Sequence, residues 1–262
     1  MILVKPFFDF KNSTSISSFV VSNIVEFLSG KIYIFVFLDT VIVLFTILQL
    51  LITVTIVIIL MFLFNKHNRK IRIAWGKLQL FLLGIKLDIV GSIDEDADLL
   101  MINHQSMLDI IIFEAILKKD IAWIAKKEIS KVPFFGLVLK LPKMIIVDRE
   151  NKAGLAKLLK ETKVKKFEEK RPVAIFPEGT RGKGKRLLKF KSGAKLIAQK
   201  HNMKVQPIIL MKTRELLDSQ GFKAKSGTVK VIYLPAVEAS KGTNWFEDTE
   251  MLMNETFNHN KV

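Results

Sequence analysis

From residue 98 onward, short apolar runs alternate with longer segments in which apolar residues recur every three or four positions. Short apolar runs are typical of buried strands, and the longer period is typical of amphipathic helices. The short runs predict strands over Leu99–Ile102, Ile121–Ala125, Met144–Val147, Val173–Phe176, Val205–Met211 and Val229–Leu234. The longer pattern predicts helices over Leu108–Leu117, Lys152–Glu169 and Ser192–His201. This alternation predicts an α/β domain whose central mixed sheet is flanked by helices.

One apolar segment is much longer than the others. Val41 to Phe64 contains no charged residue, and as a helix it would span roughly 36 Å, enough to cross a hydrocarbon core of about 30 Å. The alternative is a buried helix of a soluble protein, but such helices rarely exceed about 20 uniformly apolar residues. A cleaved signal peptide fits poorly because the run is too long and begins too late. We therefore expect an N-terminal membrane anchor region over residues 1–64, with a transmembrane helix at about 41–64.

The net charge of +16 is distributed unevenly. Residues 1–64 carry equal numbers of lysines and acidic residues, so the excess lies in residues 65–262. A domain this basic usually meets nucleic acid, lipid headgroups or phosphorylated substrates. Basic residues directly after the apolar segment predict that this end is cytoplasmic. Residues 65–84 are either a basic helix in the membrane interface or the first helix of the globular domain.

The chain contains no cysteine, which excludes a disulfide framework, thiolate metal sites and a cysteine nucleophile. Its first candidate for chemistry is "NHQSMLD", residues 103–109, between two apolar runs. One interpretation is a capping box, with Ser106 as the N-cap and Asp109 three residues later. The other is a general base, in which Asp109 accepts a hydrogen bond from Nδ1–H of His104 and leaves Nε2 to take a proton. The two are compatible, because capping and orienting can share one turn.

The second candidate is "VAIFPEGTRGKGKRLLKFKSG", residues 173–193. Pro177 and Gly179 indicate a turn after a buried strand, in which Glu178 and Arg181 could simply form an exposed ion pair. The segment is also rich in glycine, lysine and arginine, which favours binding of a phosphate. A nucleotide-binding loop is a poor match, because Arg186 stands where serine or threonine should hold magnesium.

Further basic residues follow two of the predicted strands. Lys126 follows the strand that ends at Ala125, and Arg149 follows the strand that ends at Val147. Alone, each is most simply a surface charge. Arg149 gains interest because the carboxyl ends of parallel strands meet at one edge of a sheet, where His104 and Glu178 are also expected.

These segments together resemble the glycerolipid acyltransferases, in particular the 1-acyl-glycerol-3-phosphate acyltransferases, over residues 75 to 235. The resemblance rests on "NHQSMLD", "KKEISKVPFFG" followed by "IIVDR", "FPEGTR", and "VQPIIL" around Pro207, in the family's order. It implies that the chain divides into an acyltransferase domain over residues 85–240 and a C-terminal tail over residues 241–262. The domain would lie at the cell membrane, on the cytoplasmic face.

The resemblance also implies a reaction and a set of roles. A fatty acyl group passes from acyl-carrier protein or acyl-CoA to the sn-2 hydroxyl of lysophosphatidate, giving phosphatidic acid. His104 is the general base and Asp109 orients it. Substrate-binding roles fall to Lys126, Arg149, Glu178, Gly179, Thr180 and Arg181, and backbone amides near "VQPIIL" would meet the oxyanion. No metal or cofactor is expected, because a hydroxyl attacking a thioester needs only a base.

Several alternatives remain open from the sequence. Glycerol 3-phosphate or another lysophospholipid could be the acceptor within the same family. A membrane-tethered nucleic-acid-binding module would account for the charge but shows no binding motif, so we expect no nucleic-acid partner. A hydrolase using Ser106 lacks the Gly-x-Ser-x-Gly elbow.

Overall fold

The computed structural model describes residues 40–148, 152–218, 220–221 and 223–261. By compactness, residues 46–262 form one unit and residues 1–45 another. Thr40–Leu63 is a helix of 24 residues, long and apolar enough by length and composition to cross a membrane. It is followed by a short 3₁₀ helix, η1 (Asn65–His67), and by α2 (Asn68–Leu82).

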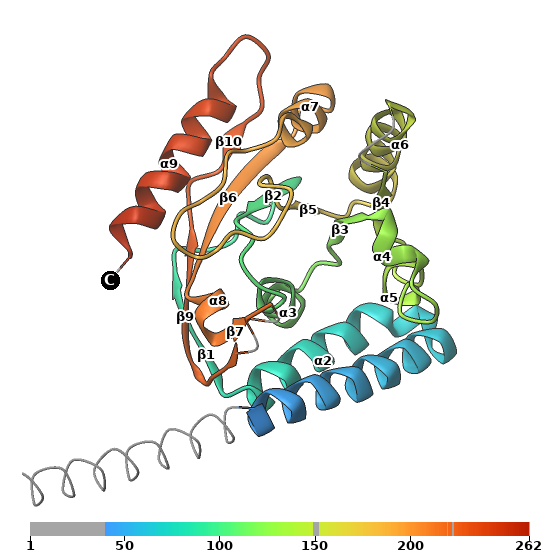
Figure 1. Ribbon diagram of the computed structural model, residues 1–262. Helices are drawn as coiled ribbons and strands as arrows, with labels where there is room; N and C mark the ends of the chain where they lie inside the picture. The colour runs from blue at the N-terminus through green and yellow to red at the C-terminus, as the bar shows by residue number, and fades with distance from the viewer. Residues whose placement is uncertain (1–39, 149–151, 219, 222, 262) are drawn as a thin grey trace, which may run out of the picture. The chain divides into compact units, whose positions relative to one another are not determined.

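Helix α2 packs between the apolar helix and the rest of the domain. Gln79 of α2 is buried and donates from Nε2 to Oγ1 of Thr53 at 2.9 Å, and Trp75 donates to the same oxygen at 3.3 Å. On its other side α2 lies against α3 (Leu108–Ile116), and Figure 1 shows the two helices close together. A Cβ added to Gly76 of α2 would lie 2.7 Å from the backbone nitrogen of Ala115, so only glycine permits this approach. This packing agrees with a first helix of the domain, and a location of residues 65–84 in the membrane interface stays a prediction.

The central sheet is mixed, with the strand order β1-β9-β6-β2-β5-β3-β4 and β10 paired with β6. Its strands are β1 (Ile85–Val90), β2 (Leu99–Ile102), β3 (Ala122–Lys126), β4 (Ile145–Val147), β5 (Val173–Ile175), β6 (Lys204–Met211), β9 (Gly227–Tyr233) and β10 (Val237–Glu238). Strands β6, β2, β5, β3 and β4 run parallel, whereas β9 is antiparallel to β6. The carboxyl ends of the five parallel strands therefore meet at one edge.

Successive side chains of β2 point to opposite faces of the sheet, and each face is covered by an apolar layer. Leu99 and Met101 pack into a core with α6 (Lys152–Lys163), α7 (Ser192–Lys200) and α9 (Trp245–His259). Leu100 and Ile102 pack into the other core, which includes α3. This is the period-two arrangement of a strand buried on both faces. In Figure 1, α9 runs along β6.

The remaining elements are short and border the sheet. They are α4 (Lys127–Lys131), α5 (Leu137–Lys140), the π-helix η2 (Val164–Glu168), α8 (Thr213–Leu216), and a small two-stranded sheet of β7 (Leu217–Asp218) and β8 (Lys223–Ala224).

The structure confirms the predicted α/β class, and β2 has the predicted bounds. The other predicted strands and helices are present with ends displaced by one or two residues, except that helix 152–169 divides into α6 and η2. Strand β1, helices α4, α5 and α8, and helix α9 within the residues expected as a tail were not predicted.

Candidate active site

His104 lies just beyond the carboxyl end of β2, where Asn103 connects it to the sheet. The side chain of Asn103 is buried and pairs with the backbone of Leu210 in β6: Nδ2 donates to the Leu210 carbonyl at 3.0 Å, and the Leu210 N–H donates to Oδ1 at 2.7 Å. The side-chain amide of Asn103 thus continues the hydrogen bonding between β2 and β6 by one further pair. It holds the turn to His104 in place where β2 ends.

The turn after His104 brings its imidazole onto Asp109. Nδ1 of His104 lies 2.8 Å from Oδ2 of Asp109. The same oxygen accepts the backbone N–H groups of Gln105 at 2.7 Å and Ser106 at 2.9 Å. Because a carboxylate oxygen only accepts, Nδ1 of His104 donates the proton, which leaves Nε2 unprotonated in the neutral ring.

The N-cap of α3 is Met107, one residue after the predicted Ser106, and Ser106 contacts the first turn from the position before it. Oγ of Ser106 accepts the Leu108 N–H at 3.1 Å at the start of α3, and it donates to the Leu217 carbonyl at 2.5 Å. Asp109 is fully buried, whereas 12% of the His104 side chain is exposed. One local turn therefore both contacts the start of α3 and holds the imidazole, although the predicted N-cap position was one residue too early.

The "FPEGTR" segment follows β5 and packs directly against the His104 backbone. Gly179 N–H donates to the Phe176 carbonyl at 3.0 Å, which closes a tight turn, and Gly179 has a φ of 74° that favours glycine. Gly182 N–H then donates to the His104 carbonyl at 2.7 Å. The loop and the histidine are held as one assembly.

Glu178 is the buried charge at this junction. Its Oε1 accepts the His104 N–H at 2.7 Å, and its Oε2 accepts the Leu188 N–H at 2.7 Å. Removal from water raises the pKa of Glu178 to about 7, although the two backbone N–H groups act in the opposite direction. Both oxygens are thus occupied by the protein backbone, and Glu178 fastens the loop to His104.

The basic residues of the loop follow this junction along the chain. Arg181 is half-buried, and the exposed lysines and arginine that follow it are Lys183, Lys185, Arg186, Lys189 and Lys191. Thr180 is exposed. Lys126 is also exposed, at the carboxyl end of β3, two strands from β2 along the same edge. Arg149 lies outside the described residues. The structure therefore brings His104, Asp109, Glu178 and Gly179 together and places Lys126 farther along the edge.

Two residues near the site were not among those predicted. Phe176 stacks on the imidazole of His104, with ring centroids 3.8 Å apart and planes 11° from parallel. Arg214 in α8 donates to the Gly182 carbonyl at 2.9 Å and pairs with Asp218 at 3.1 Å. The position of Phe176 inside "FPEGTR" was the one signal that could have found it. Nothing in the sequence near Arg214 indicates its contact with a loop 32 residues earlier.

Comparison with known proteins decides the family. The family model described as Acyltransferase matches residues 92–211. A protein of Helicobacter pylori named 1-acyl-sn-glycerol-3-phosphate acyltransferase is 39% identical over 198 residues, which cover 74% of this chain and 83% of that protein. The chain belongs to the 1-acyl-sn-glycerol-3-phosphate acyltransferase family. The matched segment of this acyltransferase contains His104, Asp109 and the whole "FPEGTR" loop.

Two further similarities bear on this acyltransferase. The crystal structure of the 1-acyl-sn-glycerophosphate acyltransferase of Thermotoga maritima superposes with a TM-score of 0.69 at 21% identity, covering 84% of this chain and 95% of that one. This similarity establishes the fold. A Rhizobium meliloti protein named lyso-ornithine lipid O-acyltransferase is 30% identical over 128 residues, 48% of this chain and 43% of that protein. The chain spans less than half of that relative.

Proposed function

We propose that this acyltransferase transfers a fatty acyl group from acyl-carrier protein or acyl-CoA to the sn-2 hydroxyl of 1-acyl-glycerol-3-phosphate, giving phosphatidic acid. The observation that carries the proposal is the contact between His104 Nδ1 and Asp109 Oδ2, which lies at the carboxyl edge of the parallel strands. This edge is where open α/β sheets place their sites. The names of the relatives supply the acceptor, and the basic loop beside His104 fits a phosphate.

The proposed reaction needs one proton transfer in each direction. Nε2 of His104 takes the proton of the acceptor hydroxyl as its oxygen attacks the thioester carbonyl carbon. The buried charge of Asp109 stabilises the resulting imidazolium. The tetrahedral oxyanion collapses, the carbon–sulfur bond breaks, and the thiolate takes the proton back from the imidazolium. A thiolate is a good leaving group, so the protein has to supply only a base, orientation and stabilisation of the oxyanion.

Phosphate binding is proposed for Arg181 with Lys126 and Arg149. An arginine can bind a phosphate through two parallel hydrogen bonds, and the exposed basic residues that follow Arg181 add favourable potential. Gly179 and Thr180 shape this loop. Because both oxygens of Glu178 accept backbone N–H groups, we propose that it acts on the substrate indirectly, by holding the loop.

A membrane location is proposed for this enzyme, with the catalytic domain on the cytoplasmic face. The helix Thr40–Leu63 is long enough to span a hydrocarbon core and exposes large apolar side chains, including Phe45 and Phe62. In α2, Phe81 is 80% exposed. The basic residues that begin at Lys66 support the cytoplasmic orientation. A membrane-resident acceptor would then reach the site from the lipid.

The direct test uses membranes that contain the full chain. They are supplied with lysophosphatidate and with a fatty acyl thioester of either acyl-carrier protein or coenzyme A as donor. His104→Ala should lower kcat by about 10²- to 10⁴-fold, and equal phosphatidate formation by both proteins would refute the mechanism. Arg181→Gln should raise KM for lysophosphatidate. Lys241→Gln, on an exposed lysine beyond the sheet, removes the same charge and should leave KM unchanged.

Another lysolipid is the second candidate acceptor, because the Rhizobium meliloti relative is named for a lyso-ornithine lipid. Lyso-ornithine lipid carries no phosphate, so its use should not depend on Arg181. Assays with lysophosphatidate, glycerol 3-phosphate and lyso-ornithine lipid therefore separate the acceptors. If Arg181→Gln affects all three acceptors equally, the proposed phosphate contact is wrong.

A further inference from the structure

Behind His104 lies a column of stacked rings that the reaction chemistry does not require. Phe176, the last residue before Pro177, is stacked on the imidazole at 3.8 Å. The indole of Trp123 stacks on Phe176, with ring centroids 5.3 Å apart and the two planes 21° from parallel. His104, Phe176 and Trp123 come from the ends or interior of three strands, β2, β5 and β3, which are neighbours in the sheet.

Trp123 itself is held on several sides. It is 5% exposed, and Phe113 of α3 meets it edge to face at 6.5 Å. Its indole Nε1 donates to Oε1 of Glu114 at 2.8 Å, and Glu114 is 4% exposed. A tryptophan fixed by both packing and a hydrogen bond has one orientation, so it offers Phe176 a rigid surface.

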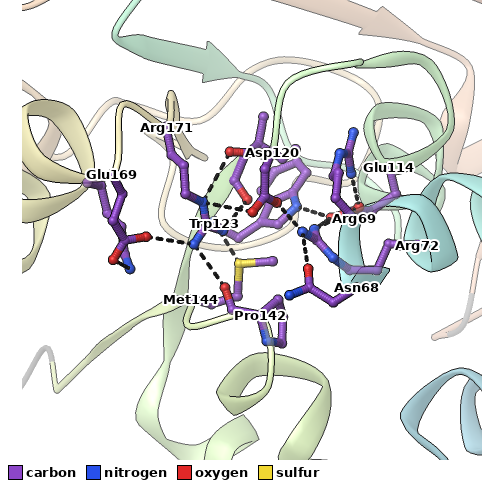
Figure 2. A network of polar contacts seen from close by, with 12 residues as sticks. Asn68, Arg69, Arg72, Glu114, Asp120, Trp123, Pro142, Met144, Glu169 and Arg171 are labelled. Atoms are coloured by element: carbon purple, nitrogen blue, oxygen red, sulfur yellow. Dashed lines mark hydrogen bonds and ion pairs between the residues drawn. The ribbon is translucent and has the colours of Figure 1, made fainter. Parts of the chain in front are cut away.

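The charge of Glu114 is balanced by two arginines of α2 (Figure 2). Arg69 Nη1 lies 2.5 Å from Oε2 of Glu114, and Arg72 Nη1 lies 2.9 Å from Oε1 and 3.0 Å from Oε2. Arg72 also binds Asp120, which in turn pairs with Arg171 at 3.1 Å. A buried carboxylate is costly unless it is paired and hydrogen-bonded, and Glu114 has three donors.

We propose that Glu114 and Trp123 are positioning residues for His104, acting through Phe176. The inference rests on the proposed function of His104 as the base. Asp109 holds only Nδ1, and a ring held at one atom can still tilt about that contact. A flat surface at 3.8 Å fixes the plane of the imidazole and hence the direction of Nε2. The π face also attracts an imidazolium, so it favours the charged ring that forms during the reaction.

The competing explanation is that Trp123 only fills the core. Its burial and its contact with Phe113 agree with that explanation as well. Loss of activity alone would not separate the two, because an unfolded site is also inactive. The test therefore needs a matched tryptophan in the core that does not touch the column, and a signal from His104 itself.

Trp245 supplies the matched control. It is 6% exposed, comparable with Trp123, and packs against Phe246 at 5.5 Å in the layer of α9. The chain has four histidines, so the resonance of His104 in protein labelled on the histidine ring is assigned by its absence in His104→Ala. A ring stacked on phenylalanine experiences a ring-current shift, which reports on stacking without reference to activity.

The experiment compares Trp123→Leu, Trp123→Phe and Trp245→Leu in the full chain in lipid nanodiscs. Trp123→Leu should move or broaden the His104 resonance and lower kcat about tenfold or more. Its KM for lysophosphatidate should stay within about twofold of the wild-type value. It should also lower the apparent pKa of the acidic limb of the kcat–pH profile. Trp245→Leu should lower the thermal stability about as much as Trp123→Leu does. Its His104 resonance and its kcat should both remain those of the wild type.

Trp123→Phe is the milder variant and carries the test if Trp123→Leu does not fold. It keeps an aromatic surface but loses the hydrogen bond to Glu114, so the His104 resonance should shift and kcat should fall by about threefold. The proposal is overturned if the His104 resonance is unchanged in both Trp123 variants, or if Trp245→Leu loses as much kcat at equal stability. Full activity of His104→Ala would refute the proposed base, whereas the resonance would still decide whether the column positions the ring.

Discussion

The carboxylate of Glu178 accepts the backbone N–H of His104 at 2.7 Å, across 74 residues of sequence. The glutamate of the "FPEGTR" loop thus holds the histidine by its main chain, while Asp109 holds it by its side chain. Two buried acidic residues thus fix one catalytic candidate from two directions. Burial raises the pKa of Glu178 to about 7.

This raised pKa predicts a pH-dependent stability. The folded protein binds a proton on Glu178 more readily than the unfolded chain, whose carboxyl has the ordinary pKa of 4.5. The contribution of Glu178 to the free energy of unfolding is therefore greatest below pH 4.5 and declines as pH rises through 7. The difference between the folded and unfolded pKa corresponds to at most about 3.5 kcal/mol. Denaturant unfolding of wild type and Glu178→Gln should give curves against pH that diverge over this window, and parallel curves would contradict the pKa.

Asp109→Asn should separate the two functions of its turn. An amide oxygen can still accept the N–H groups of Gln105 and Ser106, but the charge opposite the imidazolium is lost. We expect kcat to fall by about 10²-fold or more, with little change in KM. Steady-state kinetics with lysophosphatidate measure both values, and a variant that keeps wild-type kcat would show that the charge of Asp109 is not used.

Ser106→Ala is the complementary change in the same turn. It removes the hydroxyl that accepts the Leu108 N–H and donates to the Leu217 carbonyl. The free energy of unfolding should fall by about 1–2 kcal/mol, while the His104 contact with Asp109 stays. Activity at a temperature well below the unfolding midpoint should remain within severalfold of wild type. Abolished activity in a folded protein would instead support Ser106 as a nucleophile.

Asn103→Asp tests the amide that ends β2. The new carboxylate would keep the bond from Leu210 N–H but turn an oxygen toward the Leu210 carbonyl, where Nδ2 now donates at 3.0 Å. We expect a loss of about 1–3 kcal/mol, because the site is fully buried. Asn244→Asp, at the exposed N-cap of α9, is the matched change and should be neutral or slightly stabilising. Calorimetry on both variants gives the comparison.

Gly76→Ala should disturb the contact between α2 and α3. Its Cβ would lie 2.7 Å from Ala115 N and 2.9 Å from Ala115 Cα, which are backbone atoms that cannot rotate away. The cost should be about 1–3 kcal/mol. Gly193→Ala in α7 meets nothing within 4 Å and should stabilise by about 0.5–1 kcal/mol. Relative to wild type, the unfolding midpoint should fall in Gly76→Ala and rise in Gly193→Ala. Equal changes in the two variants would contradict this account.

The features readable from the sequence are those encoded by neighbouring residues. The apolar run of β2 has a period and length that a buried strand requires, and its bounds were predicted correctly. His104 and Asp109 are five positions apart, so the hydrogen bond between them follows from local geometry. Strand β1 was missed because its partner among the described residues is β9, about 140 residues later, and because it is exposed along much of its length. Helix α9 was missed because its four buried apolar residues, Trp245, Phe246, Met253 and Phe257, are dispersed among polar ones.

By itself, the sequence determined the α/β class, the apolar helix after residue 40, and the local turns that present His104 and Glu178. Tertiary structure alone decided that Glu178 binds the His104 backbone and that Phe176 and Trp123 lie behind the imidazole. The reason is that β2, β5 and β3 are not in chain order in the sheet. Side chains 72 residues apart become neighbours only when the strand order is set, and that order depends on burying both faces of the sheet at once.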